Sequence, residues 1–234
     1  MVNRVLRFAP LAVLVALAVV PGASPASTAF RPGNFVPRVD NPWYPLLPGT
    51  VYIYRGAEGG KPSREVMTVT RATRMIAGVR ATAVQDNVYV EGRLLERTTD
   101  WYAQDRSGNV WYLGEDTAEL DASGRVTSRE GSWRAGVNGA KAGILMPARP
   151  AVGVAARQEY LKGHAEDHFR VKAMNATVST PAVSSKRALM TEEWSPLEPG
   201  VLEDKFYVRG VGNVLAQTVA GGNDRTELVS VRRP

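Results

Sequence analysis

Residues 50–234 alternate polar and apolar side chains with a period of two, and short glycine-containing segments interrupt this alternation at intervals. The segments "TVYIYR" and "REVMTVTRAT" flank Glu58-Gly59-Gly60-Lys61, which is typical of a β-hairpin with a two-residue loop. Further turns are predicted at Gly78 and at Glu91-Gly92. About ten to twelve strands at a spacing of about 8 to 14 residues predict a mainly β protein, an antiparallel meander curled into a half-barrel or barrel.

Five prolines lie in the twenty residues Arg31–Thr50, which excludes a helix and disfavours a central strand there. We therefore expect a proline-rich extended arm over residues 27–49 and a single β-rich domain over residues 50–234. The arm is expected to pack its large apolar side chains across the body of the domain. These side chains are Phe35, Trp43, Tyr44, Leu46 and Leu47.

Two further segments depart from the strand pattern. Gly131–Gly153 combines several glycines and prolines with the apolar run Ile144-Leu145-Met146, and it predicts a long loop that covers a binding site. The stretch Ala155–Leu161 has room for one short helix.

The first residues have the layout of a secretory signal peptide: Arg4 and Arg7, an apolar run from Phe8 to Val20, then small residues. We expect a signal peptide over residues 1–26, with cleavage after Ala26 or, alternatively, after Ala29. The apolar run is shorter than the roughly 20 residues that span a bilayer, so an uncleaved anchor is the weaker reading.

Composition limits the location and the partners. The chain has no cysteine, so we expect neither disulfides nor a lipoprotein, and we predict a soluble secreted or periplasmic protein without an integral membrane segment after cleavage. Removal of Arg4 and Arg7 lowers the formal net charge from +6 to +4. The basic residues are scattered among acids and form no stripe, which argues against nucleic-acid binding.

The segment "DWYAQDRSGNVWYLGED", Asp100–Asp116, predicts a structural hairpin. Trp101-Tyr102 and Trp111-Tyr112 lie about equally far from Ser107-Gly108, so an antiparallel pair places them across from one another. Consecutive strand residues point to opposite faces, so one ring of each dipeptide faces inward and the other outward. Asp105 and Ser107 are expected to supply only local turn hydrogen bonds.

The chain contains two histidines, both in "GHAEDHF", and we expect no metal site there. On a helix His164 and His168 would lie about 6 Å apart and could share a metal. The alternation of the following residues favours a strand, which sets the two imidazoles about 13 Å apart. Pairing of His164 with Glu166 is the remaining route to a chelate, and solvated turn residues are the preferred interpretation.

Several segments together resemble a family of exported bacterial β-rich proteins whose activity is not established. They are "NPWYPLLPGTVYIYRG", "DWYAQDRSGNVWYLGED", "AGILMPARPAVG" with "RQEYLKGHAEDHF", and "PLEPGVLEDKFYVRGVGNV". The resemblance covers Asn41 to about Val229 and implies no reaction or ligand. In the family pattern the "AED" of Ala165–Asp167 recurs without flanking histidines, which argues further against a metal site here.

The sequence leaves the function open among three classes, and no enzyme motif is present. The favoured hypothesis is a binding module for a small apolar or amphipathic ligand, with no cofactor. The alternatives are an envelope hydrolase that uses carboxylates such as Glu115, Asp116 and Glu166, and a structural protein that contacts an envelope partner. The predicted ligand-binding residues are Trp101, Tyr102, Trp111, Tyr112, Leu145 and Met146.

Overall fold

The computed structural model of the protein describes residues 29–234, so the expected signal peptide lies outside the described residues. These residues form sixteen strands, and the one helical element among them is η1 (Pro32–Asn34), a single 3-10 turn. The strands are β1 (Phe35–Val36), β2 (Val51–Glu58), β3 (Lys61–Ile76), β4 (Val79–Val90), β5 (Arg93–Asp105), β6 (Val110–Leu120), β7 (Val126–Ser128), β8 (Trp133–Arg134), β9 (Lys141–Met146), β10 (Ala155–Arg157), β11 (Glu159–Tyr160), β12 (His168–Ser179), β13 (Ser184–Trp194), β14 (Leu202–Val208), β15 (Gly212–Ala220) and β16 (Arg225–Arg232).

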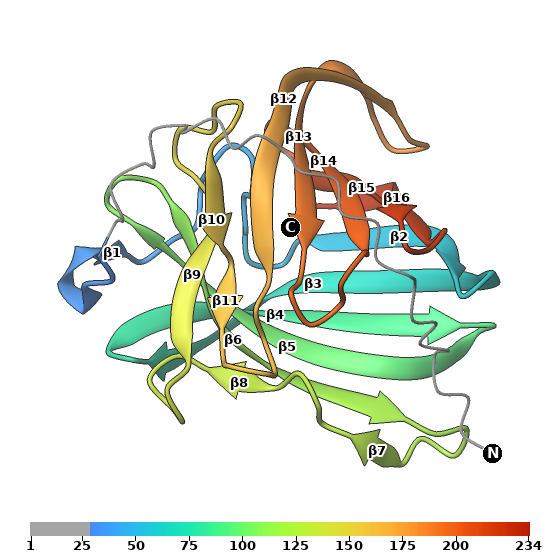
Figure 1. Ribbon diagram of the computed structural model, residues 1–234, viewed down its shortest axis with the longest axis horizontal. Coiled ribbons are helices and arrows are strands. Elements are labelled where there is room, and N and C mark those ends of the chain that lie inside the picture. The colour runs from blue at the N-terminus through green and yellow to red at the C-terminus, as the bar shows by residue number, and fades with distance from the viewer. Residues whose placement is uncertain (1–28) are drawn as a thin grey trace.

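The strands form one antiparallel sheet that curls into a nearly closed barrel (Figure 1), which confirms the predicted fold class. The strand order is β10-β12-β13-β14-β15-β16-β2-β3-β4-β5-β6-β9-β11, with β1 beside β5 and with β7 and β8 beside β6. β2–β6 and β12–β16 are each a meander of hairpins, and pairing of β16 with β2 joins the two. In Figure 1, β3–β6 run across the lower part of the view and β12 and β13 cross them steeply.

The hairpins predicted from local sequence are confirmed. Glu58 pairs with Lys61, so Gly59-Gly60 is the two-residue loop between β2 and β3. Ala77-Gly78 connects β3 to β4, and Glu91-Gly92 connects β4 to β5.

The two edges of the sheet meet at one short stretch of chain, residues 155–160, without a ladder of hydrogen bonds between them. β10 pairs with β12, and β11, which follows after a single residue, pairs with β9. Gly143 of β9 lies so close to this stretch that a Cβ atom there would be 2.2 Å from the carbonyl oxygen of Arg157. The helix expected over Ala155–Leu161 is therefore wrong, because the first half of this stretch pairs with β12 and the second half pairs with β9.

The segment Gly131–Gly153 forms part of the wall of the barrel. Both β8 and β9 pair with β6, and the run Ile144-Leu145-Met146 lies in β9. Of the expected covering loop, only the residues of β8 and β9 therefore lie in the sheet, and the rest of the segment consists of turns and loop.

Within residues 29–49, the first part pairs with the C-terminal end of β5, and the following part contributes Val39, Trp43 and Leu46 to the core. β1 pairs with β5, and the side chain of Gln104 accepts hydrogen bonds from the backbone N–H groups of Asp40 and Asn41 at 2.9 and 2.7 Å. Trp43 and Leu46 are buried as expected, whereas Leu47 is 52% exposed. The division of the chain into an arm and a domain stays a prediction.

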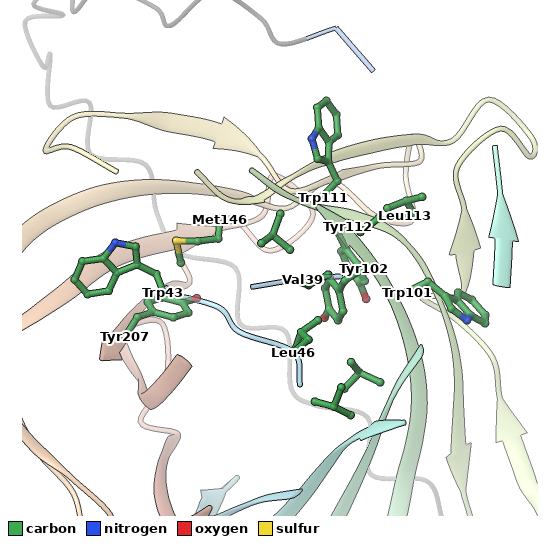
Figure 2. Packing of buried hydrophobic residues seen from close by; sticks show 14 of the residues in the cluster. Val39, Trp43, Leu46, Trp101, Tyr102, Trp111, Tyr112, Leu113, Met146 and Tyr207 are labelled. Carbon is green, nitrogen blue, oxygen red and sulfur yellow. The ribbon is translucent and has the colours of Figure 1, made fainter. Parts of the chain in front are cut away.

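The core is one continuous cluster of buried apolar side chains drawn from both meanders and from residues 29–49. Figure 2 shows its part around the β5–β6 hairpin, where Tyr102 and Tyr112 lie side by side and Trp101 points away from them.

Candidate functional site

Asp100–Asp116 forms the predicted β5–β6 hairpin. Tyr102 lies directly opposite Tyr112, and their rings stack with centroids 4.9 Å apart. A β-bulge beside this pair shifts the register, so that Trp101 and Trp111 lie opposite small residues and not opposite each other. The expected symmetry therefore holds for the tyrosines alone.

The two tryptophans point to the outer face of the sheet, yet each is only 4% exposed. The guanidinium carbon of Arg74 lies 4.8 Å from the ring centroid of Trp101. Phe30 and Phe35 pack against Trp111 with ring centroids 5.5 and 5.9 Å away. The outward rings are thus covered as well, which the alternation of faces did not predict.

Trp111 also lines an open groove of about 1130 Å³ on the outer side of the barrel. The N-terminal segment, the Gly131–Gly153 segment and β10 supply most of its wall. Most of the residues along it are apolar, among them Phe30, Trp111, Ile144, Pro147, Val154 and Ala156. The groove therefore offers a continuous apolar surface.

The charged residues of the groove all have the same sign. Arg106, Lys141, Arg149 and Arg157 line it, and no aspartate or glutamate does. All four are exposed, and none of them takes part in an ion pair within residues 29–234. Because these charges are not neutralised by neighbours, the rim of the groove is positive.

Two of the four cations are held in place at one end of the groove. The Arg157 guanidinium carbon lies 4.4 Å and the Lys141 Nζ 5.5 Å from the ring centroid of Tyr160. Arg157 Nε also donates a hydrogen bond to His168 Nε2 at 3.3 Å. These contacts already restrict the side chains of Arg157 and Lys141, so an anion that binds them costs less side-chain conformational entropy.

The predicted ligand-binding residues are distributed over different environments. Trp111 lines the groove, whereas Tyr102 and Leu145 line a smaller hollow of about 300 Å³ inside the barrel. The other three are buried and line neither of these two cavities: Trp101, Tyr112 and Met146. A role of the six in ligand binding stays a prediction.

The three carboxylates considered for hydrolysis do not form a common site. Glu115 lies opposite Asp100 and points inward. Asp116 is exposed and forms an ion pair with Arg129 at 2.8 Å. Glu166 accepts a hydrogen bond from the backbone of its own turn.

Acids inside the barrel hold their protons unusually tightly. Burial, the largest cause, raises the pKa of Asp100 to about 7, of Glu115 to about 9 and of Glu159 to about 8. Repulsion from neighbouring carboxylates adds to each shift; for Glu115 these are mainly Asp100 and Glu159. Near neutral pH the inner wall therefore carries fewer negative charges than its composition suggests.

The sequence did not identify four other charged residues that face the inside of the barrel. Glu65, Asp86, Glu203 and Lys205 line the hollow. One pattern could have indicated them, namely a charged residue at an apolar position of a strand, because Glu65 lies on the same face as Met67. Alternation alone does not show which face of such a strand is enclosed, so these positions resembled ordinary solvated ones.

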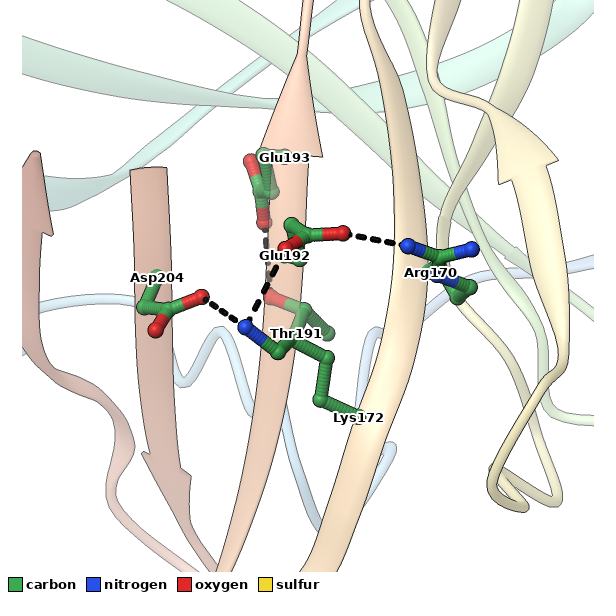
Figure 3. Close-up of polar contacts among 6 residues, drawn as sticks. All are labelled: Arg170, Lys172, Thr191, Glu192, Glu193 and Asp204. Atoms are coloured by element: carbon green, nitrogen blue, oxygen red, sulfur yellow. Dashed lines mark hydrogen bonds and ion pairs between the residues drawn. The ribbon is translucent and has the colours of Figure 1, made fainter. Parts of the chain in front are cut away.

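The outer face of β12–β14 carries a compact set of ion pairs (Figure 3). Glu192 binds Arg170 at 2.5 Å and Lys172 at 3.1 Å, and Lys172 also lies 3.2 Å from Asp204. Here each acid has a cationic partner, and the Arg170 and Lys172 groups lower the pKa of Glu192 against the effect of burial. This cluster is therefore neutralised by its own members.

The histidines lie in different settings. His164 is exposed in the turn before β12, and His168 begins β12 and stacks on Trp194 with centroids 5.6 Å apart. Across residues 29–234, no group of three or more His, Asp or Glu side chains is arranged to hold a metal ion. The same residues contain no helix of the length and apolarity that a bilayer crossing requires.

Comparison with known proteins assigns no function to the chain. No family model and no curated protein matches it. One solved structure that resembles it is described as a "putative exported protein with YmcC-like fold" from Bacteroides fragilis, with 14% identity, a TM-score of 0.45 and coverage of 82% of this chain and 99% of that one. Another is a "putative lipoprotein" from Parabacteroides distasonis, with 12% identity, a TM-score of 0.42 and coverage of 81% and 98%.

Proposed function

We propose that the protein binds an amphiphile with an anionic head group, with the apolar body in the outer groove and the head group at its rim. The observation that carries the proposal is the charge pattern of the groove: an apolar wall, four cations and no acid. This pattern matches a ligand that is apolar along its length and negative at one end.

The size and the chemistry of the groove agree with such a ligand. Its volume of about 1130 Å³ lies slightly above the range of about 300–1,000 Å³ that is typical of small-molecule sites, which leaves room for a long alkyl chain. Burial of an alkyl chain against Trp111 and Ile144 supplies the non-directional part of the affinity. Guanidinium groups such as those of Arg149 and Arg157 can hold a carboxylate or phosphate with two parallel hydrogen bonds.

The place of action is part of the proposal. The sequence of residues 1–26 has the layout of a signal peptide, so we place the mature protein outside the cytoplasm, in the periplasm or secreted. N-terminal sequencing of the protein from its host tests this, with a start between Val2 and Phe8 as the result that contradicts it.

The binding proposal is tested by isothermal titration calorimetry with dodecanoate and dodecyl phosphate below their micelle concentrations. Both are expected to bind, and dodecyltrimethylammonium is not. The double variant Arg149→Gln/Arg157→Gln should weaken dodecanoate binding by about tenfold or more, equivalent to about 1.4 kcal/mol. Arg187→Gln, which removes an exposed cation outside the groove, is the matched control and should bind as the native protein does.

A second pair of variants tests whether the ligand lies in the groove, by filling the groove with a large side chain. Ala155 is exposed and lines the groove, so Ala155→Trp should fill it and abolish binding. Ala122→Trp adds the same ring in an exposed turn outside the groove and should have no effect. Equal binding of the cationic and anionic amphiphiles, or unchanged binding by Ala155→Trp, would overturn the proposal.

A further inference from the structure

The hollow inside the barrel is a second cavity, separated from the groove by the sheet. Ile144 of β9 lines the groove, and the next residue, Leu145, lines the hollow. Ten of the residues around the hollow are aromatic or charged: Tyr44, Tyr52, Tyr54, Tyr102 and Tyr207, with Glu65, Asp86, Asp100, Glu203 and Lys205. Four acids thus share the hollow with one base, the reverse of the charge of the groove.

The single base is already paired with acids. Lys205 Nζ lies 2.9 Å from Glu193 Oε2 and 3.2 Å from Glu203 Oε2. Glu193 also accepts hydrogen bonds from Thr191 and Tyr207, at 3.0 and 3.2 Å, so this group is fixed by several contacts. The close ion pairs of Lys205 are therefore with Glu193 and Glu203, and its charge acts on Glu65 only from a longer distance.

The remaining three acids, Glu65, Asp86 and Asp100, have no cationic partner. None of them belongs to an ion pair of residues 29–234. Glu65 and Asp86 are within hydrogen-bonding reach of each other, and Oδ1 of Asp86 is buried and accepts no hydrogen bond from an N–H or O–H group of the described residues. Burying a charge without a partner is costly, so a fold alone has no need for this arrangement.

Aromatic rings complete the wall beside these acids. The ring centroid of Tyr44 lies 5.5 Å from that of Tyr102 and 6.5 Å from that of Tyr207. The hydroxyl of Tyr54 is already used, since it donates to the carbonyl oxygen of Asn213 at 3.1 Å. Aromatic faces attract organic cations, most strongly where water is excluded.

We propose that the hollow binds a small organic cation of the alkylammonium class. Its ammonium group lies among the carboxylates of Glu65, Asp86 and Asp100, and its carbon chain lies against the tyrosine rings. A volume of about 300 Å³ fits a ligand of only a few carbon atoms, at the lower end of the range of small-molecule sites. The described residues present no arrangement for a bare metal ion, which favours an organic cation.

The protonation of the three acids supports this assignment. Burial raises the pKa of Glu65, Asp86 and Asp100, so these carboxyl groups hold their protons more tightly when the hollow is empty. The protons take the place of a cation that would balance the carboxylate charges. A bound ammonium ion replaces those protons.

Calorimetry with butylammonium, at a pH near 8, tests the proposal. Butylammonium is expected to bind, whereas 1-butanol and butyrate, which share its chain but not its charge, are not. The double variant Glu65→Gln/Asp86→Asn keeps the shape of the wall and removes two charges, so binding should fall by at least tenfold. Glu198→Gln, an exposed acid outside the hollow, is the matched control and should leave binding unchanged.

Two further variants test the size of the hollow and separate binding in the hollow from binding in the groove. Ala216 lines the hollow, so Ala216→Leu should weaken butylammonium binding by reducing the volume without changing any charge. Ala155→Trp, which fills the groove, should leave butylammonium binding intact, so the two sites succeed or fail separately. Equal binding of 1-butanol, displacement of butylammonium by magnesium or calcium ions, or unchanged binding by the Glu65/Asp86 variant would overturn the proposal.

Discussion

The hydroxyl group of Tyr112 donates a buried hydrogen bond of 2.5 Å to Oδ1 of Asp100, across the β5–β6 hairpin. Burial, the largest cause, raises the pKa of Asp100, as do the charges of Asp86 and Glu96, and the hydrogen bond from Tyr112 offsets part of this rise. The net result is a carboxyl group that changes its charge near pH 7 inside the barrel. The hairpin thus contributes a titrating group to the inner wall as well as its aromatic rings to the core.

Tyr112→Phe removes that donor and is expected to lower the free energy of unfolding by about 2 kcal/mol at pH 8, the scale of a hydrogen bond to a charged group. At pH 5, where Asp100 is protonated, the loss should be smaller. Urea denaturation at both pH values measures the difference. Tyr89→Phe is the control, because the Tyr89 hydroxyl takes part in no side-chain hydrogen bond of the described residues, and an equal effect of both substitutions would contradict the prediction.

Asp100→Asn is expected to make stability less dependent on pH. The pKa of Asp100 is raised in the folded state to about 7 from 3.8, so the folded state binds the proton more tightly than the unfolded state. Stability therefore falls as pH rises through this window, by an amount of the order of a few kcal/mol, and the asparagine variant escapes that loss.

Thermal melts between pH 5 and pH 9 measure this effect. The melting temperature of the variant relative to that of the native protein should rise by several degrees between pH 5 and pH 8. Its curve should still slope, because the raised pKa values of Glu115 and Glu159 remain. Asp116→Asn, at an exposed ion pair, is the control, and parallel curves for native protein and Asp100→Asn would refute the assignment.

Asp105 holds the hairpin loop more firmly than its sequence position indicated. It is 1% exposed and accepts hydrogen bonds from the N–H groups of Ser107 and Asn109, at 2.9 and 3.0 Å, from the Asn109 amide at 2.8 Å and from the Trp111 indole at 2.9 Å. All of these donors lie within the hairpin, as expected for local turn hydrogen bonds, but their number and burial predict a larger contribution to stability than a single turn contact. Asp105→Ala should cost about 3 kcal/mol or more in urea denaturation, because several buried donors lose their acceptor.

Ser107→Ala is the matched control for this prediction. Only the backbone N–H of Ser107 takes part in the loop, so loss of its hydroxyl should change stability by about 0.5 kcal/mol or less. Similar costs for the two substitutions would show that the loop, and not the carboxylate, sets the stability of the hairpin.

The elements that the sequence predicted correctly are those specified by neighbouring residues. Gly59-Gly60 and Glu91-Gly92 join strands that are adjacent in the chain, so local turn chemistry and alternation are sufficient to identify them. The helix prediction for Ala155–Leu161 was wrong because the backbone hydrogen bonds of this stretch go to both β9 and β12, which no local pattern reveals.

The candidate sites were predictable only in part. Trp111 was recognised as a large aromatic side chain, but its groove depends on Phe30, Ile144 and Ala156, which come together only in the folded barrel. The acids of the hollow show the same limit. Glu65 and Asp86 are neighbours through the pairing of β3 with β4, and whether their shared face is enclosed depends on closure of the sheet.

Gly143→Ala tests that closure directly. A Cβ atom at this position would lie 2.2 Å from the carbonyl oxygen of Arg157 and 2.5 Å from Gln158, so β9 and the stretch 155–160 would have to separate. Since the contact is with backbone, no side-chain rotation relieves it, and we expect a loss of about 3 kcal/mol or more together with faster hydrogen exchange of the β9, β10 and β11 amides. Gly33→Ala is the control, because nothing lies within 4 Å of the added atom and φ there is not positive.

The contact between β9 and the stretch 155–160 also brings Lys141 and Arg157 to the same end of the groove. Gly143→Ala should therefore weaken dodecanoate binding even at temperatures where the rest of the barrel stays folded. Unchanged exchange in β9–β11 would mean that the sheet tolerates an open edge there, and that the geometry of the groove does not depend on this contact.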